Sequence, residues 1–322
     1  MSSPTIPPAV ATEPQKGQVA MRDTGGSVGE VRRGGWFVWI VIGVIVVIWM
    51  IPTLGVLVTS FRPENLVVTT GWWTAFAHPF RAAGWTLENY QTALDAAGFG
   101  NAFLNSLAVS LPSTVIPITI AAFAAYAFSW MDFRGRYVMF VAVVGLLVVP
   151  LQMALIPILR LYADGAVIAG YRIFPDLDLN GTFLGVWLAH TGFGLPLATY
   201  LLRNYIGSLP SSIIESAKID GADHFTIFWR LIIPLSVPAL AAFAIFQFLW
   251  VWNDLLVAYV FLGGSSQNQV LTIALRNLLG GRGEDWQVLT AAAFISMSLP
   301  LIVFFSLQKY FVRGLTAGAV KG

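Results

Sequence analysis

The sequence contains no cysteine and few charged residues, and both shortages exclude functions. Without cysteine the chain can form no disulfide, thiolate nucleophile or cysteine-ligated metal site. Only 11% of the 322 residues are charged, against roughly 25% in an ordinary soluble domain. The net charge of +2 is too small to indicate a nucleic-acid-binding surface. These shortages exclude an ordinary soluble domain and leave no basis for a nucleic-acid partner.

Sites for catalysis, metals and ATP are also missing from the sequence. A phosphate-binding Walker loop needs a lysine followed by Ser or Thr after a glycine-rich turn, whereas the lysines here are followed by Gly17, Ile219, Tyr310 and Gly322. No nucleophile and base are paired in an enzyme-like pattern. The three histidines have no second ligand at metal spacing: His78, His190 and His224. We therefore expect a non-catalytic chain without cofactor or metal.

Apolar residues dominate instead, at 57% of the chain. A helix that crosses a membrane needs about 20 mainly apolar residues. Six segments meet this length: Trp36–Ser60, Phe103–Trp130, Tyr137–Leu161, Thr182–Tyr205, Leu235–Leu262 and Val288–Phe311. Residues 1–35 are rich in Pro, Gly, Ser, Thr and Ala without apolar periodicity, which is typical of a disordered tail. The sequence thus predicts an all-α integral membrane protein with one membrane domain over residues 36–322.

Basic residues indicate the orientation, because cytoplasmic segments are enriched in Lys and Arg. With the amino terminus inside, twelve basic residues lie inside: Lys16, Arg22, Arg32, Arg33, Arg134, Arg136, Arg203, Lys218, Arg230, Lys309, Arg313 and Lys321. Six lie outside: Arg62, Arg81, Arg160, Arg172, Arg276 and Arg282. Both termini, and the loop over residues 206–234, are therefore predicted to be cytoplasmic.

The loop over residues 206–234 is predicted to hold two short helices that meet at a bend. Ser212 and Glu215 fit a capping box at the start of the first helix. Asp220-Gly221 is a turn-forming pair that ends it. In the second helix, residues spaced i, i+3, i+4 and i+7 form one apolar stripe: Phe225, Phe228, Trp229 and Ile232. These features fit either an interfacial helix on the membrane surface or a docking element for another protein.

The residues of this loop resemble the cytoplasmic EAA loop of ABC importer permeases, usually written EAA, three residues, G, nine residues, I-x-L-P. Here Glu215-Ser216-Ala217 is followed by Gly221 and then by Leu231, Ile233 and Pro234, so Ser replaces the second letter, and Leu and Ile are exchanged. The resemblance implies a coupling helix around Ser212–Ile219 that contacts an ATP-binding subunit. The coupling residues would be Glu215, Ser216, Ala217, Asp220 and Gly221.

Further motifs, in family order, resemble carbohydrate permeases of the MalG type, a MetI-like fold. They are TLENY (Thr86–Tyr90), NSL (Asn105–Leu107), VPLQMALIPI (Val149–Ile158), IDGAD (Ile219–Asp223), WND (Trp252–Asp254) and GAVKG (Gly318–Gly322). The resemblance implies a bacterial inner-membrane permease for oligosaccharides or disaccharides that works by alternating access. Its implied partners are a second homologous permease, an ATPase dimer that binds ATP and Mg, an extracytoplasmic sugar-binding protein and membrane lipid.

Two other functions stay open, and one segment bears on both. An ABC permease for peptides, amino acids or polyamines would share the EAA-like loop. A secondary transporter would need charges within the membrane, and Asp254 stands nearly alone in the apolar segments.

Asp254, together with Gln247, Trp252 and Asn253, is the candidate substrate path. The alternative is that these residues satisfy other helices or a helix break, as structural or gating elements.

Overall fold

The computed structural model describes residues 35–77, 79, 82–96, 98–263, 265, 267–278 and 285–317. Residues 1–34 of the predicted tail and the terminal Gly318–Gly322 lie outside the described residues. The chain divides into two units, residues 1–51 and residues 52–322. In the first unit, the described residues form the amino-terminal part of helix α1. The second unit contains the other helices and is the one described below.

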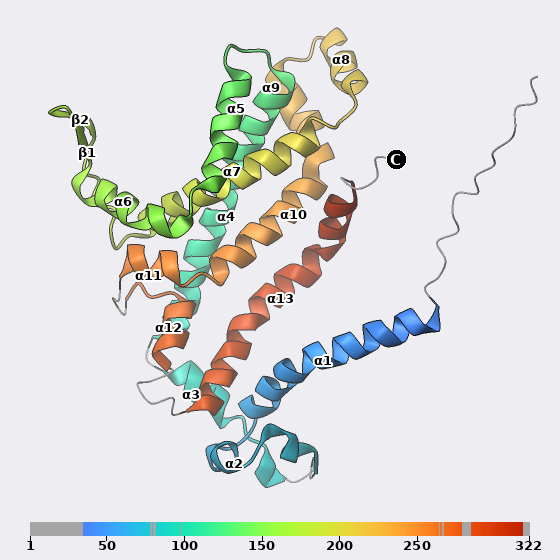
Figure 1. Cartoon of the computed structure of the whole chain (residues 1–322), viewed down its shortest axis with the longest axis vertical. Coiled ribbons are helices and arrows are strands. Elements are labelled where there is room, and N and C mark those ends of the chain that lie inside the picture. Colours follow the sequence, from blue (N-terminus) through green and yellow to red (C-terminus); the bar gives the residue numbers. More distant parts are fainter. Residues whose placement is uncertain are drawn as a thin grey trace, which may run out of the picture. The chain divides into compact units, whose positions relative to one another are not determined.

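The described chain is mostly helical (Figure 1). Its α-helices are α1 (Trp36–Ser60), α2 (Glu64–Thr69), α3 (Glu88–Asp95), α4 (Phe99–Trp130), α5 (Arg136–Gly145), α6 (Leu151–Asp164), α7 (Phe183–Ile206), α8 (Ser211–Ile219), α9 (His224–Ile227), α10 (Ile233–Trp252), α11 (Leu256–Leu262), α12 (Leu271–Leu278) and α13 (Trp286–Ala317). Short 3-10 turns are η1 (Trp72–Ala77), η2 (Ala82–Gly84) and η3 (Leu146–Val148), and η4 (Phe228–Ile232) is a π-helical turn.

One β-hairpin interrupts the helices, so the prediction of a purely α-helical chain is corrected to a mostly helical one. Strands β1 (Ala166–Ile168) and β2 (Tyr171–Phe174) pair antiparallel between α6 and α7. Their two-residue turn has positive φ at both positions, 51° at Ala169 and 83° at Gly170. This is the backbone of a type I′ turn, whose twist matches that of the paired strands.

Four helical stretches of the described residues are long and apolar enough to cross a membrane, or five if one bent pair counts as a single span. The four are Trp36–Ser60, Phe99–Trp130, His224–Trp252 and Trp286–Lys309. Helix α7 covers the predicted segment Thr182–Tyr205 but is not among them. It carries His190 and Arg203 in a less apolar sequence. The count of six spans therefore stays a prediction.

Two predicted spans have a different course from a single straight helix. The segment Tyr137–Leu161 bends by 106° between the α5–η3 stretch and α6. Pro150 lies at this bend, and the residue before a proline is driven to an extended backbone, as Val149 is. The segment Leu235–Leu262 breaks after Trp252, and α11 begins at Leu256. Neither segment is therefore a single continuous helix.

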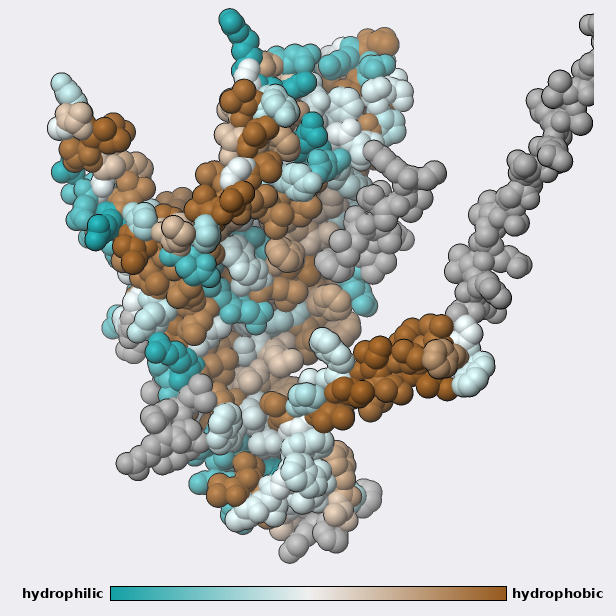
Figure 2. All heavy atoms as spheres, viewed as in Figure 1, coloured by the Kyte–Doolittle hydropathy of each residue, from teal (hydrophilic) through white to brown (hydrophobic). Residues whose placement is uncertain are grey.

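The core of the second unit forms where α4 packs along α7 and where α10 packs against α4 and α13. Small residues line part of the α4–α7 contact, with Ala121, Ala125 and Ala198 fully buried. Small side chains let membrane helices approach closely. Close van der Waals packing then holds the helices together, because in lipid there is no hydrophobic driving force between them. In Figure 2, hydrophobic residues cover much of the visible surface, and hydrophilic residues gather near α8 and the end of α5.

Candidate functional site

Helix α8 occupies the predicted coupling segment, although it starts differently from the prediction. The helix begins at Ser211, directly after Pro210, and its first turn has no side-chain cap. Ser212 is therefore already inside the helix, and the predicted capping box of Ser212 and Glu215 is wrong. Proline sets φ near the helical value and precedes the first helical residue here (φ −59°), so the start needs no hydroxyl cap.

The end of α8 is the bend that the sequence predicts. Gly221 has φ +81°, in the left-handed region. The N–H of Ala222 donates to the carbonyl of Ala217 at 2.9 Å, and the N–H of Gly221 donates to the carbonyl of Lys218 at 3.0 Å. These two bonds make a Schellman motif, which satisfies the last carbonyls of the helix and reverses the chain. Gly221 thus ends α8 at Ile219 and turns the chain toward α9.

One face of α8 is buried and the rest is exposed. Ile214 is 2% exposed and joins a cluster of α4 and α7 side chains, against which Ala217 also packs. The other coupling residues are exposed: Glu215, Ser216, Asp220 and Gly221. Ile219 is 86% exposed, although it is a large apolar residue in a short polar helix. Single exposed apolar side chains are common on protein surfaces, so Ile219 by itself does not mark an interaction surface.

Helix α9 starts at a well-formed cap and is bound to α4. Asp223 Oδ1 accepts from the N–H of Thr226 at 2.8 Å. Hydrogen bonding with the side chain of Thr226, and then with its backbone, holds the pKa of Asp223 below its ordinary value. The Oη of Tyr126 and the Nδ1 of His224 share a hydrogen bond of 2.8 Å. The chain then continues through η4 into α10. The second helix of the loop is therefore continuous with a long helical stretch, His224–Trp252, rather than separate from it.

The predicted single apolar stripe is split between two faces. Phe228 and Ile232 are buried at 3% and 0%, whereas Phe225 and Trp229 are 67% and 47% exposed. The π turn η4 adds residues to the turn, so positions that share a face in a regular α-helix separate here. Pro234 follows η4 and supplies no N–H to the preceding turn. Two of the four residues can therefore contact a partner, and two pack inside the protein.

The WND segment forms the break between α10 and α11. Trp252 is 2% exposed, and its Nε1 donates to the Ser296 carbonyl of α13 at 3.2 Å. Asn253 is exposed and donates to the Leu249 carbonyl at 2.7 Å. Asp254 Oδ2 accepts from the N–H of Ala258 at 3.0 Å, as a capping carboxylate of α11. These contacts give Trp252 and Asp254 structural roles, and they leave Asn253 as the most accessible side chain of the three.

Three polar side chains, from α7, from α10 and from the break after α10, lie largely inside the protein. We call His190, Gln247 and Asp254 the interior polar row. Gln247 is 1% exposed, donates from Nε2 to the Ser113 carbonyl at 3.2 Å and lies against Gly194. His190 is fully buried, and its Nε2 lies 3.8 Å from Asp254 Oδ2, beyond hydrogen-bonding distance. Neither ring nitrogen of His190 has a hydrogen-bond partner among the described residues.

His190 is the residue of this row that sequence reasoning missed, because nothing in the sequence joins it to Asp254. Its ring meets the Trp250 ring edge-on, with centroids 5.6 Å apart. Trp250 also lines an apolar cavity of about 490 Å³ beside the α5–α6 bend and α7. Within the described chain no three metal-binding side chains come together. The row is thus a set of buried hydrogen-bonding groups, with an aromatic ring between His190 and the cavity.

Comparisons with known proteins agree on one kind of protein. The family model described as "Binding-protein-dependent transport system inner membrane component" matches residues 24–317. The osmoprotective compounds uptake permease protein of Synechocystis sp. is 59% identical over 274 residues, which cover 85% of this chain and 88% of that protein. The alpha-glucoside transport system permease protein of Rhizobium meliloti is 63% identical over 237 residues, which cover 74% of this chain and 60% of that protein.

A solved structure supports the fold. It is the crystal structure of a bacterial ABC transporter involved in the import of the acidic polysaccharide alginate. One of its chains matches with a TM-score of 0.67 at 21% identity, over 86% of this chain and 96% of that chain. A second crystal structure, of a bacterial alginate ABC transporter in complex with a periplasmic protein that holds an alginate pentasaccharide, matches with a TM-score of 0.59 at 13% identity. At these identities the likeness is one of fold.

Proposed function

The chain belongs to the family of binding-protein-dependent transport system inner membrane components, and from this premise we propose that it is the permease subunit of an ATP-driven sugar importer. Such a subunit conducts the solute and is not itself an enzyme. The sugar assignment is supported by the alpha-glucoside permease, 63% identical, and by an arabinooligosaccharides transport system permease protein of Halalkalibacterium halodurans, 30% identical over 288 residues. We infer that the substrate is an oligosaccharide or disaccharide.

The proposed topology has six spans and cytoplasmic termini. The spans are α1, α4, the bent α5–α6 pair, α7, the stretch from α9 to α11, and α13. Helix α7 is the least apolar of the six, and its burial against α4 and α10 supports counting it as a span. A helix that neighbouring helices cover needs less lipid-facing apolar surface. The excess of basic residues on the inner segments supports the orientation.

The observation that carries the proposal is the geometry of α8. Ile214 fixes the helix to the cluster of α4 and α7, while Glu215, Ser216 and Asp220 remain exposed next to a left-handed Gly221. A short helix with one anchored face and one open face suits docking into the surface of another protein. On the open face, the small side chain of Ser216 allows that surface to approach closely, whereas Ala217 packs against the cluster. We infer that this surface belongs to a separate ATP-binding subunit, which would hold the ATP and Mg.

The proposed mechanism is alternating access. Closure of an ATP-binding dimer would displace α8, and the cluster around Ile214, Phe228 and Ile232 would transmit that displacement to α4, α7 and α10. A second homologous permease would complete the path, and an extracytoplasmic binding protein would deliver the sugar. Of the candidate path residues, Asn253 would face the solute because it is the most accessible, and Asp254 would hold the start of α11 beside it. Gln247 and Trp252 would position them through their buried contacts.

The test is uptake by the complete transporter in proteoliposomes. The chain is co-purified with the permease, ATPase and binding protein that neighbouring genes encode. Uptake of labelled α-linked disaccharides is then measured with ATP enclosed in the proteoliposomes. We expect uptake that requires both ATP and the binding protein. Uptake driven by an ion gradient without ATP would contradict the proposal in favour of a secondary transporter.

A second candidate solute follows from the 59% identical permease for osmoprotective compounds. The same proteoliposomes distinguish the two solutes when a labelled zwitterionic osmoprotectant, such as glycine betaine, replaces the sugar. Competition between unlabelled sugar and labelled osmoprotectant shows whether both use one path. ATP-dependent uptake of the osmoprotectant alone would keep the importer class but exclude the sugar assignment, and the same result with a peptide, an amino acid or a polyamine would do likewise.

A further inference from the structure

Arg62 is a buried cation immediately after the first long apolar helix. Its side chain is 2% exposed, and burial lowers its pKa from the ordinary value. Helix α1 has 25 residues and is about 37 Å long at 1.5 Å per residue, which exceeds a hydrocarbon core of roughly 30 Å. Because Arg62 lies just beyond the end of α1 at Ser60, its position along the chain corresponds to the lipid headgroup layer.

The contacts of Arg62 are with neutral groups only. Its terminal nitrogens donate to the Leu66 carbonyl at 3.1 Å, to the Thr70 carbonyl at 3.3 Å, to the Thr70 hydroxyl, and to the Thr74 hydroxyl at 3.3 Å. Among the residues that the structure describes, its Nε has no hydrogen-bond partner and no acidic side chain forms an ion pair with it. A buried charge without a counter-charge is costly, so an anion beside Arg62 would be stabilised.

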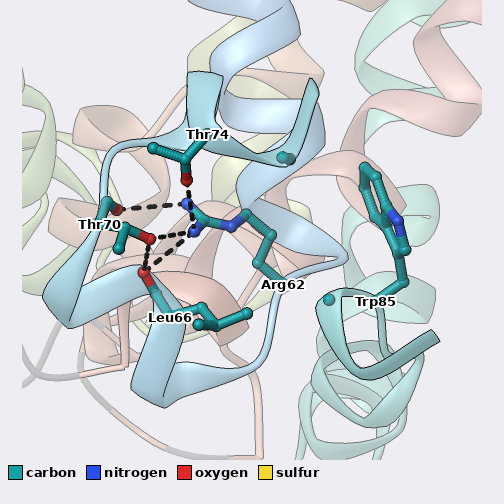
Figure 3. Close-up of a pocket in the computed structure, with 7 residues that line it drawn as sticks. Arg62, Leu66, Thr70, Thr74 and Trp85 are labelled. Atoms are coloured by element: carbon teal, nitrogen blue, oxygen red, sulfur yellow. Dashed lines mark hydrogen bonds between the residues drawn. The ribbon is translucent and has the colours of Figure 1, made fainter. Parts of the chain in front are cut away.

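Two cavities meet at this arginine. One, of about 210 Å³, is lined by Arg62, Thr70, Thr74 and Trp85 among others. Figure 3 shows the guanidinium directed toward Thr70 and Thr74, with Trp85 at a distance on another side. This first cavity, which we call the headgroup pocket, offers a cation, hydroxyl groups and an indole ring. Arginine and hydroxyl side chains are groups that bind phosphate oxygens.

The second cavity, of about 430 Å³, also reaches Arg62 and runs between α1 and α13. We call it the acyl groove. Its α1 wall has the spacing of one helix face, and its α13 wall is formed by residues four apart: Pro52, Gly55, Val56 and Thr59, with Trp286 and Thr290. Apart from Arg62 this lining has no charged side chain. An apolar groove at membrane depth suits a hydrocarbon chain, because a sugar would find few hydrogen-bonding partners there.

We propose that Arg62, the headgroup pocket and the acyl groove together bind one membrane phospholipid, with its phosphate beside the guanidinium and one acyl chain between α1 and α13. The charge, the depth of Arg62 and the apolar groove that leads away from it all match this occupant. The site is separate from α8 and from the interior polar row. It does not depend on which solute the transporter carries.

Photolabelling of the purified complete transporter tests the site. The probe is phosphatidylglycerol with a diazirine on one acyl chain, and the comparison probe is diacylglycerol with the same chain but no phosphate. After irradiation and digestion, mass spectrometry locates the label. We expect label in peptides that contain residues 52–59 and 286–290, about tenfold stronger with phosphatidylglycerol, which is the ratio that one charge-assisted contact gives.

Three variants isolate the contributions. Arg62→Gln should reduce phosphatidylglycerol labelling of these peptides about tenfold. Val56→Trp should fill the acyl groove and abolish labelling while Arg62 and its contacts remain, which covers the case in which Arg62→Gln fails to fold. Arg160→Gln is the matched control, because Arg160 is an exposed arginine on α6, and labelling should be unchanged. Gel filtration and thermal unfolding verify the fold of each variant.

Other outcomes overturn the proposal. Equal labelling by the two probes would mean that no headgroup is recognised. Loss of labelling in excess inorganic phosphate would indicate a free anion rather than a lipid. If Arg62→Gln leaves the labelling intact but weakens docking of the binding protein, the headgroup pocket receives an acidic side chain of that protein instead. Because labelling needs neither ATP nor sugar, its failure leaves the proposed transport function untouched.

Discussion

Replacing Gly221 by valine should uncouple the proposed ATP-binding subunit from the membrane helices. Gly221 has φ +81°, and a Cβ built there meets no atom within 4 Å. The added Cβ therefore meets no neighbour, and the expected cost of the substitution is backbone strain. A residue with a Cβ loses about 1–2 kcal/mol in the left-handed region, and a β-branched residue is less tolerated still. If the bend is required for docking, binding of the ATP-binding subunit should weaken by a factor of about 5–30.

The chain itself provides a matched control. Gly135, in the loop between α4 and α5, has φ +83°, and a Cβ there also meets nothing within 4 Å. Gly135→Val thus carries the same strain outside α8. The assays are co-purification of the ATP-binding subunit and uptake in proteoliposomes. Extraction of the chain from membranes by detergent monitors its insertion. Gly221→Val should lose both activities and remain inserted, Gly221→Asn should lose less because Asn tolerates this backbone, and Gly135→Val should retain both.

Three results would refute this reasoning. Unchanged co-purification with Gly221→Val would show that the bend does not present α8 to the ATP-binding subunit. Equal losses in Gly221→Val and Gly135→Val would show that general backbone strain, rather than the bend of α8, reduces assembly. A loss of uptake with intact co-purification would place the effect after docking, and the account of the bend as a docking feature would then be wrong.

Three further predictions concern the exposed apolar residue of α8 and the interior polar row. Ile219→Ser should leave the thermal stability of the chain unchanged, because this side chain is 86% exposed. It should weaken co-purification of the ATP-binding subunit by about tenfold or more if that subunit buries the side chain. Unchanged co-purification would exclude Ile219 from the contact. Gly194→Ala should destabilise the chain by about 1–3 kcal/mol, because the new Cβ would lie 2.6 Å from Gln247 Nε2. Gly192→Ala is the control and should leave the stability unchanged, because a Cβ there meets nothing within 4 Å. Thermal unfolding of both variants measures the difference. Asp254→Ala should lower the stability of the chain by about 0.5–2 kcal/mol through loss of the α11 cap, and Asp254→Asn should lower it less. A change in the KM of uptake without loss of stability would instead favour contact between Asp254 and the solute.

The end of α8 was predictable because local chemistry determines it. Asp220-Gly221 specifies a left-handed stop wherever the helix lies, and the observed Schellman bonds follow from that pair. The start was not predictable to one residue. Ser212 and Glu215 match a capping box, which would start the helix at Ile213, but the helix begins at Ser211, directly after Pro210. Two local signals competed, and the proline prevailed because its ring fixes the backbone before any side-chain hydrogen bond forms.

The interior polar row could be predicted only in part, because its contacts join distant segments. Asp254 and Gln247 were identifiable as polar residues within an apolar segment. His190 was not, since its position 3.8 Å from Asp254 depends on how α7 packs against the break after α10. The break itself was only an alternative reading of WND in the sequence. Tertiary contacts hold the break in place. Trp252 Nε1 donates a hydrogen bond to the Ser296 carbonyl of α13, and the Thr272 hydroxyl donates to the Asp254 carbonyl at 2.7 Å.

The split of the apolar stripe changes how force would pass from α8 into the membrane. One continuous stripe would have carried it along a single helix into α10. Instead Ile214 of α8 belongs to the same buried cluster as Phe228 and Ile232, together with Leu202 of α7 and Ala121 of α4. Displacement of α8 must therefore repack contacts with three long helices at once, because a close-packed interior deforms between discrete arrangements rather than continuously. Phe225 and Trp229 remain exposed, so they would be available to the proposed docking surface of α8.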